Sequence, residues 1–174
     1  MNEQAQRELL QRFEFREIRP QEAEEAAEIE QICFPPNEAC SREHMLERAR
    51  RAPELFYVAW DPEKKRIAGY LNGIATHEER LRDEFFTDAS LHEKDGPVVM
   101  LLGLDVRPEY RRQGLARAIM TGYEERERRR GRRCLVLTCH DEKVDMYRRM
   151  GFSDLGMSGS VWGGVAWHEM ECRL

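Results

Sequence analysis

The most informative segment of the sequence reads Leu104-Asp105-Val106-Arg107-Pro108-Glu109-Tyr110-Arg111-Arg112-Gln113-Gly114-Leu115-Ala116. The apolar run that leads into it, Val98 to Val106, predicts a buried strand, and Pro108 predicts a turn. The residues from Gly114 to Arg130 have the spacing of an amphipathic helix. A loop that runs directly from a strand into a helix aims unpaired backbone N–H groups, and the positive end of the helix dipole, at one point. We therefore expect an anion to bind at this turn.

Two features of the turn indicate that the anion is a pyrophosphate. Gly114 and Ala116 carry little or no side chain that could keep phosphates from the backbone, and Arg111 and Arg112 add positive charge. The pattern is neither the P-loop G-x-x-x-x-G-K-[ST] nor the dinucleotide fingerprint G-x-G-x-x-G. An ordinary strand-to-helix turn with basic residues is the alternative interpretation.

The rest of the chain predicts a mixed α/β domain around this segment. A second apolar strand, Cys134 to Cys139, follows the helix, so that strand, helix and strand form a parallel crossover. Leu55 to Trp60 and Ile67 to Thr76 predict an antiparallel hairpin, and His77 to about Gly96 reads as a long polar loop. The remaining expected elements are a strand at Glu14 to Ile18, helices from Pro20, at Ser41 to Arg51 and at Asp141 to Met150, and two strands after Phe152. We expect one domain over residues 14–174, preceded by a helical extension at 1–13.

Composition excludes several classes of protein. The 174 residues carry a formal net charge of −5, which disfavours nucleic acid as the main partner. The basic run Glu124 to Arg133 could bind nucleic acid, but it also fits a solvated helix end with its arginines last. No segment has the length of a membrane span and no signal peptide is expected. Five cysteines without a metal-ligand spacing predict no metal site and a reducing, cytoplasmic location.

The motif Arg111-x-x-Gly114-x-Ala116 after an apolar strand resembles the acetyl-CoA motif of the GNAT superfamily of N-acetyltransferases. Further segments are similar to its arylalkylamine (serotonin) N-acetyltransferase branch. These are Glu14-Phe15-Arg16 with Pro20, Glu28-Ile29-Glu30 with Phe34, Glu78-Glu79-Arg80-Leu81, Leu91-His92, Val144-x-x-Tyr147-x-Arg149-x-Gly151-Phe152 and Glu169-Met170-x-Cys172-x-Leu174. The resemblance implies a mostly antiparallel sheet that is splayed at one parallel pair, with helices on both faces. It also implies that acetyl-CoA is the co-substrate and enters the splayed pair.

The resemblance assigns cofactor contacts to particular residues. The backbone of Leu104, Asp105 and Val106 matches the strand that pairs with the pantetheine and polarises the thioester carbonyl. The pyrophosphate loop is matched by Arg111, Arg112, Gln113, Gly114, Leu115 and Ala116, and Tyr147 and Arg149 belong to the same cofactor site.

Acetyl transfer to an amine needs a neutral amine, a stabilised oxyanion and a proton for the leaving thiolate. Tyr147 matches the family's tyrosine next to the CoA sulfur and is our candidate general acid; a core aromatic is the alternative. The general base departs from the vertebrate pattern, because Met100 and Leu102 occupy the positions of its two histidines. His140 is the best remaining titrating group. Ordered water, or an amine that arrives neutral, could also serve.

The acceptor pocket is predicted from aromatic side chains. Phe34 and Trp167 match positions of the family's aromatic slot, and Trp162 lies close to Trp167 in the sequence. Core packing of these residues is the alternative. Leu104 and Thr138 complete the expected substrate contacts.

We therefore expect an enzyme that transfers the acetyl group of acetyl-CoA to a small primary amine in a ternary complex. The acceptor is an arylalkylamine or alkyl amine, and the protein is a monomer or homodimer. A protein or peptide amine as acceptor, and a non-catalytic acyl-CoA-binding module, are the alternative hypotheses.

Overall fold

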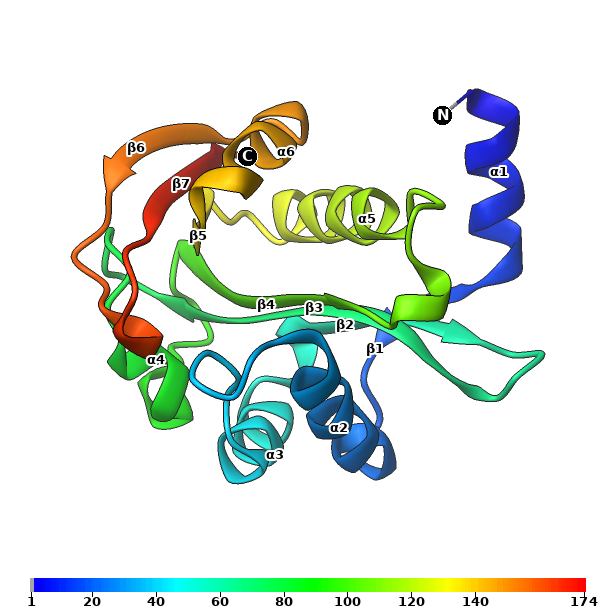
Figure 1. Cartoon of the computed structure of the whole chain (residues 1–174), viewed down its shortest axis with the longest axis horizontal. Coiled ribbons are helices and arrows are strands. Elements are labelled where there is room, and N and C mark those ends of the chain that lie inside the picture. Colours follow the sequence, from blue (N-terminus) through cyan, green and yellow to red (C-terminus); the bar gives the residue numbers. More distant parts are fainter. Residues whose placement is uncertain (1) are drawn as a thin grey trace.

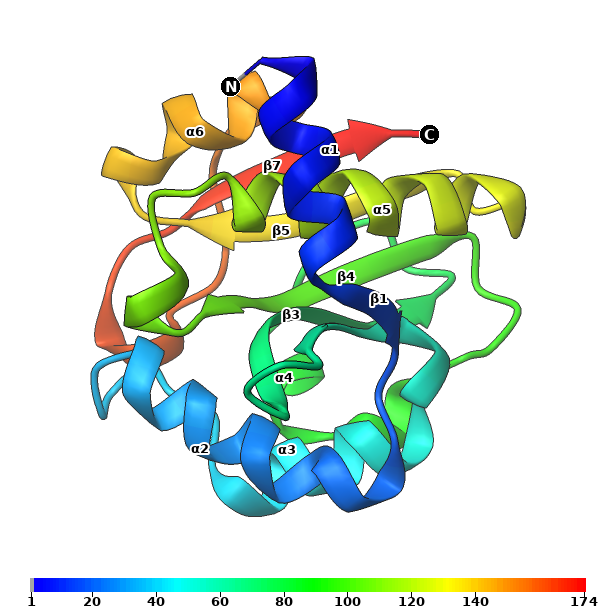
Figure 2. The same cartoon turned by 90° about the vertical axis from the view of Figure 1, so that its right-hand side faces the viewer.

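A computed structural model describes residues 2–174 as one seven-stranded sheet with helices on both faces (Figures 1 and 2). The strand order is β1-β2-β3-β4-β5-β7-β6, and only the β4–β5 pair is parallel. The strands are β1 (Glu14–Glu17), β2 (Phe56–Asp61), β3 (Arg66–Thr76), β4 (Val98–Val106), β5 (Cys134–Cys139), β6 (Ser153–Met157) and β7 (His168–Arg173). The helices are α1 (Glu3–Arg12), α2 (Ala23–Cys33), α3 (Arg42–Arg51), α4 (Glu84–Thr87), α5 (Leu115–Arg129) and α6 (Val144–Arg149). The predicted fold class is confirmed.

Helix α5 covers one face of the sheet because its apolar residues recur at helical spacing. Its buried residues include Leu115, Ile119 and Tyr123. The basic residues of its last turn lie on the solvent side and interact favourably with the negative end of the helix dipole. Helix α1 crosses beside α5 on this face (Figure 2) and buries Leu9. The predicted N-terminal segment is thus a packed helix.

Helices α2 and α3 lie on the opposite face, below the sheet in Figure 1. The apolar stripe of α2, which includes Ala26, Ala27 and Ile29, is buried against the sheet. Helix α3 begins at Ser41, whose hydroxyl accepts a hydrogen bond from the His44 N–H at 3.2 Å. The two faces are therefore closed by helices from different parts of the chain.

The site is positioned by the divergence of β4 from β5. Their parallel pairing covers only three residue pairs, Val98–Cys134, Val99–Leu135 and Met100–Val136. Beyond Met100, β4 pairs with β3 alone, while β5 continues to pair with β7 up to Cys139. From Leu101 onward, β4 and β5 are therefore no longer paired with each other, as the family resemblance implied.

A β-bulge in β4 lies at the start of this divergence. Asn72 is opposite Gly103 and Gly73 is opposite Leu101, so Leu102 has no partner in the register. A Cβ at Gly73 would lie 2.5 Å from the Met100 carbonyl oxygen. Glycine at position 73 therefore permits the close approach of the strands at the bulge.

The prediction of a polar loop from His77 to Gly96 was wrong in part. The segment contains α4 and a 3₁₀ turn at Ala89–Leu91, and Leu81, Phe85 and Phe86 are buried. Charged residues dominate the composition of this segment, and α4 is too short for a helical periodicity of its apolar residues to be recognised. The loop is a second wall of the site, as the contacts of Phe86 below show.

Candidate active site

A pocket of about 730 Å³ opens where β4 and β5 diverge. Its floor is apolar and is formed by Leu71, Leu101, Leu102, Leu104 and Leu137. Met100 is fully buried and does not reach the pocket. The positions at which the resemblance places two histidines therefore hold only apolar side chains.

The loop that enters α5 has the geometry of an anion cradle. Arg112 and Gly114 both have positive φ angles, of 61° and 82°. The first hydrogen bond of α5 runs from the Ala118 N–H to the carbonyl of Gly114, the residue before the helix. The N–H groups that precede Ala118 therefore have no partner within the helix. Successive N–H groups of this kind form a nest for phosphate. Arg111, Arg112 and Ala116 line the pocket from this end, so the residues present fit a pyrophosphate.

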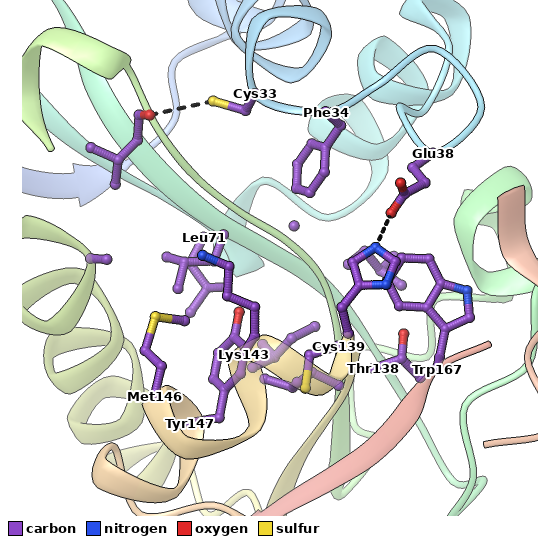
Figure 3. Close-up of a pocket in the computed structure, with 18 of the residues that line it drawn as sticks. Cys33, Phe34, Glu38, Leu71, Thr138, Cys139, Lys143, Met146, Tyr147 and Trp167 are labelled. Atoms are coloured by element: carbon purple, nitrogen blue, oxygen red, sulfur yellow. Dashed lines mark hydrogen bonds and ion pairs between the residues drawn. The ribbon is translucent and has the colours of Figure 1, made fainter. Parts of the chain in front are cut away.

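Tyr147 lies across the pocket from α2, on α6 (Figure 3). Its ring packs edge to face on Phe152, with centroids 5.7 Å apart. Burial, and then the neighbouring Cys139 and Asp105, raise the pKa of its hydroxyl. The phenol is therefore protonated at neutral pH and can donate.

His140 follows β5 and is held by two contacts. Its Nε2 lies 2.5 Å from Glu38 Oε1, and its ring stacks on Trp167 with centroids 4.3 Å apart. Glu38 comes from the loop between α2 and α3 and points toward the ring (Figure 3). A carboxylate bonded to one nitrogen of an imidazole fixes the orientation of the ring. The structure thus pairs the candidate base with a carboxylate that the sequence analysis did not select.

The predicted aromatic residues meet at one end of the pocket. Phe34, Trp162 and Trp167 all line it, together with Thr138. The indole N–H of Trp162 donates to the Glu38 carbonyl at 2.7 Å, and that of Trp167 donates to the Trp162 carbonyl at 2.8 Å. Trp162 also stacks on Phe86 at 4.8 Å. The loops that carry these side chains are therefore bonded to each other.

Three predicted site residues lie elsewhere. Arg149 is exposed on α6 and does not line the pocket. Gln113 accepts a hydrogen bond from Arg12 at 3.3 Å, and the Asp105 side chain is buried on the α2 side of β4. The backbone of Asp105 faces β3, where it is paired with Tyr70, so Leu104 and Val106 rather than Asp105 face the free edge of β4. Leu115 and Gly114 border a smaller hollow beside the anion loop.

Several pocket residues were missed by the sequence analysis. They include Glu30, Glu38, Lys143 and Met146. Lys143 lies four residues before Tyr147, a spacing that puts both on one side of the helical turn and could have been found. Glu30 follows Ala26 and Ala27 by four and three positions, so the helical spacing of the buried stripe could have indicated that it turns inward.

The sequence profile of the acetyltransferase (GNAT) family matches residues 22–152, which is most of the chain. The chain belongs to this family. It is an acetyl-CoA-dependent N-acetyltransferase. The acetyltransferase is 29% identical to the serotonin N-acetyltransferase of Mesocricetus auratus, over 97% of this chain and 81% of the relative.

Solved structures resemble the acetyltransferase at lower identity. The loading GNATL domain of CurA from Lyngbya majuscula has a TM-score of 0.80 at 13% identity, covering 92% of this chain and 97% of that one. A phosphinothricin acetyltransferase from Sinorhizobium meliloti, solved with acetyl-CoA, has a TM-score of 0.66 at 17% identity, covering 94% and 89%. These similarities show the fold. Within residues 2–174 no group of potential metal ligands occurs, and no helix there could cross a membrane.

Gly114→Val is expected to weaken acetyl-CoA binding at least about tenfold, because a β-branched residue resists the positive φ that shapes the cradle. Calorimetric titration measures this change. Gly131→Val is the matched control, since Gly131 has a φ of 81° with open space around it at the far end of α5. Both variants should lose about 1–2 kcal/mol of stability in urea. Equal cofactor affinity in the two variants would contradict the assignment of the cradle.

Proposed function

We propose that the acetyltransferase acetylates a small primary amine, an arylalkylamine or alkyl amine, by direct attack in a ternary complex. The observation that carries this proposal is the His140–Glu38 pair beside an aromatic-lined end of the same pocket that holds Tyr147. Phe34, Trp162 and Trp167 line this end of the pocket and offer apolar aromatic contacts to an aryl group. The 29% identity to a serotonin N-acetyltransferase supports the same acceptor class.

The proposed chemistry divides the protons between two walls of the pocket. Neutral His140 takes one proton from the acceptor ammonium, and the free amine attacks the thioester carbonyl. Backbone N–H groups on the free edge of β4 at Leu104 stabilise the oxyanion. Tyr147 gives its proton to the departing thiolate, and the resulting phenolate takes the second proton from the nitrogen of the intermediate, which leaves the amide and the CoA thiol. Glu38 stabilises the imidazolium of His140 and fixes its orientation.

His140→Gln is expected to lower kcat/KM for the amine about 100-fold and to remove the fall of activity on the acidic side of the pH profile. The fall arises because His140 must be neutral to accept a proton. Initial rates between pH 5.5 and 9 measure it. His77→Gln serves as the control, because His77 pairs with Glu93 at 2.9 Å and does not line the pocket. An unchanged profile in His140→Gln would assign proton removal to water.

The function is tested by thiol release from acetyl-CoA with phenethylamine, tryptamine, polyamines, amino acids and short peptides as acceptors. Turnover is expected with the first two and with few of the others. Preference for a peptide would instead indicate a protein amine as acceptor. Acetyl-CoA binding without turnover of any acceptor would overturn the proposal.

A further inference from the structure

Two buried carboxyl groups meet at the wall of the acceptor pocket. Glu30 on α2 is 2% exposed and Asp105 on β4 is fully buried. Neither Glu30 Oε1 nor Asp105 Oδ1 accepts a hydrogen bond from an N–H or O–H donor of the other described residues, so these two oxygens can bond to each other only by sharing a proton. Glu30 lines the pocket together with Gly103. A carboxyl oxygen buried in this way is costly unless it bonds to something.

The oxygens converge on the bare side of Gly103. A Cβ at that position would lie 3.0 Å from Asp105 Oδ1, 3.2 Å from Asn72 Nδ2 and 3.4 Å from Glu30 Oε1. Because residue 103 is glycine, this polar spot is not covered by a side chain. It lies in β4 next to Leu104, at the edge where the thioester carbonyl is expected.

The other oxygens of the pair are fixed by the protein. Glu30 Oε2 accepts the Cys40 N–H at 2.9 Å, and Asp105 Oδ2 lies 2.8 Å from the Tyr70 hydroxyl. Burial, and then the charge and hydrogen bond of Glu30, raise the pKa of Asp105 well above its usual range. Asp105 therefore holds its proton at neutral pH.

The surrounding side chains leave the Glu30 carboxyl group available to a ligand. The only guanidinium that contacts the cluster within residues 2–174 is Arg48, which donates to Asn72 Oδ1 and to the Phe86 carbonyl, both at 2.8 Å, rather than to a carboxylate. Cys40 also faces the pair from the loop after α2, and Cys33, further along α2, is near Asp105. None of these groups forms an ion pair with Glu30.

We propose that Glu30, supported by Asp105, receives the positively charged amino group of the acceptor and makes the pocket select amines over neutral molecules of the same shape. The inference rests on the proposed function and identifies what recognises its substrate. An ammonium group offers several N–H donors to Glu30 Oε1 in a pocket whose floor is otherwise apolar. His140 then removes the proton from the amine held there.

The experiment compares phenethylamine with 2-phenylethanol, which has the same ring and chain but no charge. Calorimetric titration in the presence of CoA gives the dissociation constants of both probes at pH 7. In the wild type we expect the amine to bind about 10- to 100-fold more tightly, as hydrogen bonds to charged groups imply. Glu30→Gln should abolish this preference and change the affinity of the alcohol less than about twofold. The amide can still accept the Cys40 N–H.

Gln31→Ala is the matched control, because Gln31 donates to the Cys40 carbonyl at 2.8 Å and does not reach the pocket. It loosens the same loop, so it should leave the ratio of the two constants unchanged. A wild type that binds both probes equally would overturn the inference without any variant. So would loss of the preference in Glu38→Gln but not in Glu30→Gln. Acetylation of phenethylamine is assayed in parallel: its absence refutes the proposed function and with it this inference, whereas turnover with an unchanged ratio refutes this inference alone.

Discussion

Tyr147→Phe is expected to lower kcat for amine acetylation about 100-fold or more, while the dissociation constant of acetyl-CoA changes less than about threefold. The substitution removes only the hydroxyl, and the ring can keep its edge-to-face contact with Phe152. Single-turnover kinetics and calorimetric titration separate the two quantities. The loss should affect every acceptor amine alike, because protonation of the thiolate does not depend on the acceptor.

A raised pKa is compatible with this role. Burial makes the Tyr147 phenolate unfavourable, but the thiolate that leaves beside it is removed from water as well, and its own pKa rises for the same reason. Transfer of a proton from the phenol to the thiolate therefore stays balanced. In a fully exposed site the thiol would keep its ordinary pKa, and a phenol with a raised pKa would then be a poor proton donor to the thiolate.

Tyr57→Phe is a suitable control for the tyrosine prediction. Tyr57 is buried on β2 against α5, and it does not line the pocket. Its hydroxyl, like that of Tyr147, is removed without a change in ring size. A similar kcat for wild type and Tyr147→Phe would exclude Tyr147 as the general acid.

The sequence predicted those features that depend on local patterns. The apolar run of β4, the spacing of α5 and the small residues at Gly114 and Ala116 are all readable along the chain. They define the split sheet and the cradle, which are the features most closely tied to backbone geometry. The aromatic residues Phe34 and Trp167 were found through the resemblance.

The acid–base groups depend on contacts between distant segments. Glu38 meets His140 across 102 positions, and Glu30 meets Asp105 across 75. In α2, Glu30 lies on the same face as Ala26 and Ala27, so helical periodicity indicates that it turns inward. The partners of Glu30 and Glu38 are set by the packing of α2 and the following loop on the sheet, so neither pairing could be read from the sequence. The pairings need the tertiary structure.

Asp105→Asn is expected to become more stable than the wild type as the pH rises above about 4. An unfolded Asp ionises near pH 4, whereas the folded protein holds the Asp105 proton to higher pH. Between these two pKa values the native state binds more protons than the unfolded state. The wild type therefore loses stability with rising pH by about 1.4 kcal/mol per unit through this group. Asparagine does not titrate, so the Asp105→Asn variant does not lose stability with rising pH through this position.

Urea unfolding of both proteins at pH 4, 5, 6 and 7 measures the difference. The amide at position 105 can accept from Tyr70 and donate to Glu30 Oε1, as the protonated acid does, so the two proteins should be similar at pH 4. Carboxyl groups that do not contact Asp105 titrate equally in both and cancel in the difference. A constant difference would mean that Asp105 titrates normally. A variant that becomes less stable with rising pH would show that Asp105 is a carboxylate paired with Arg48, and the raised pKa of Asp105 would then be wrong.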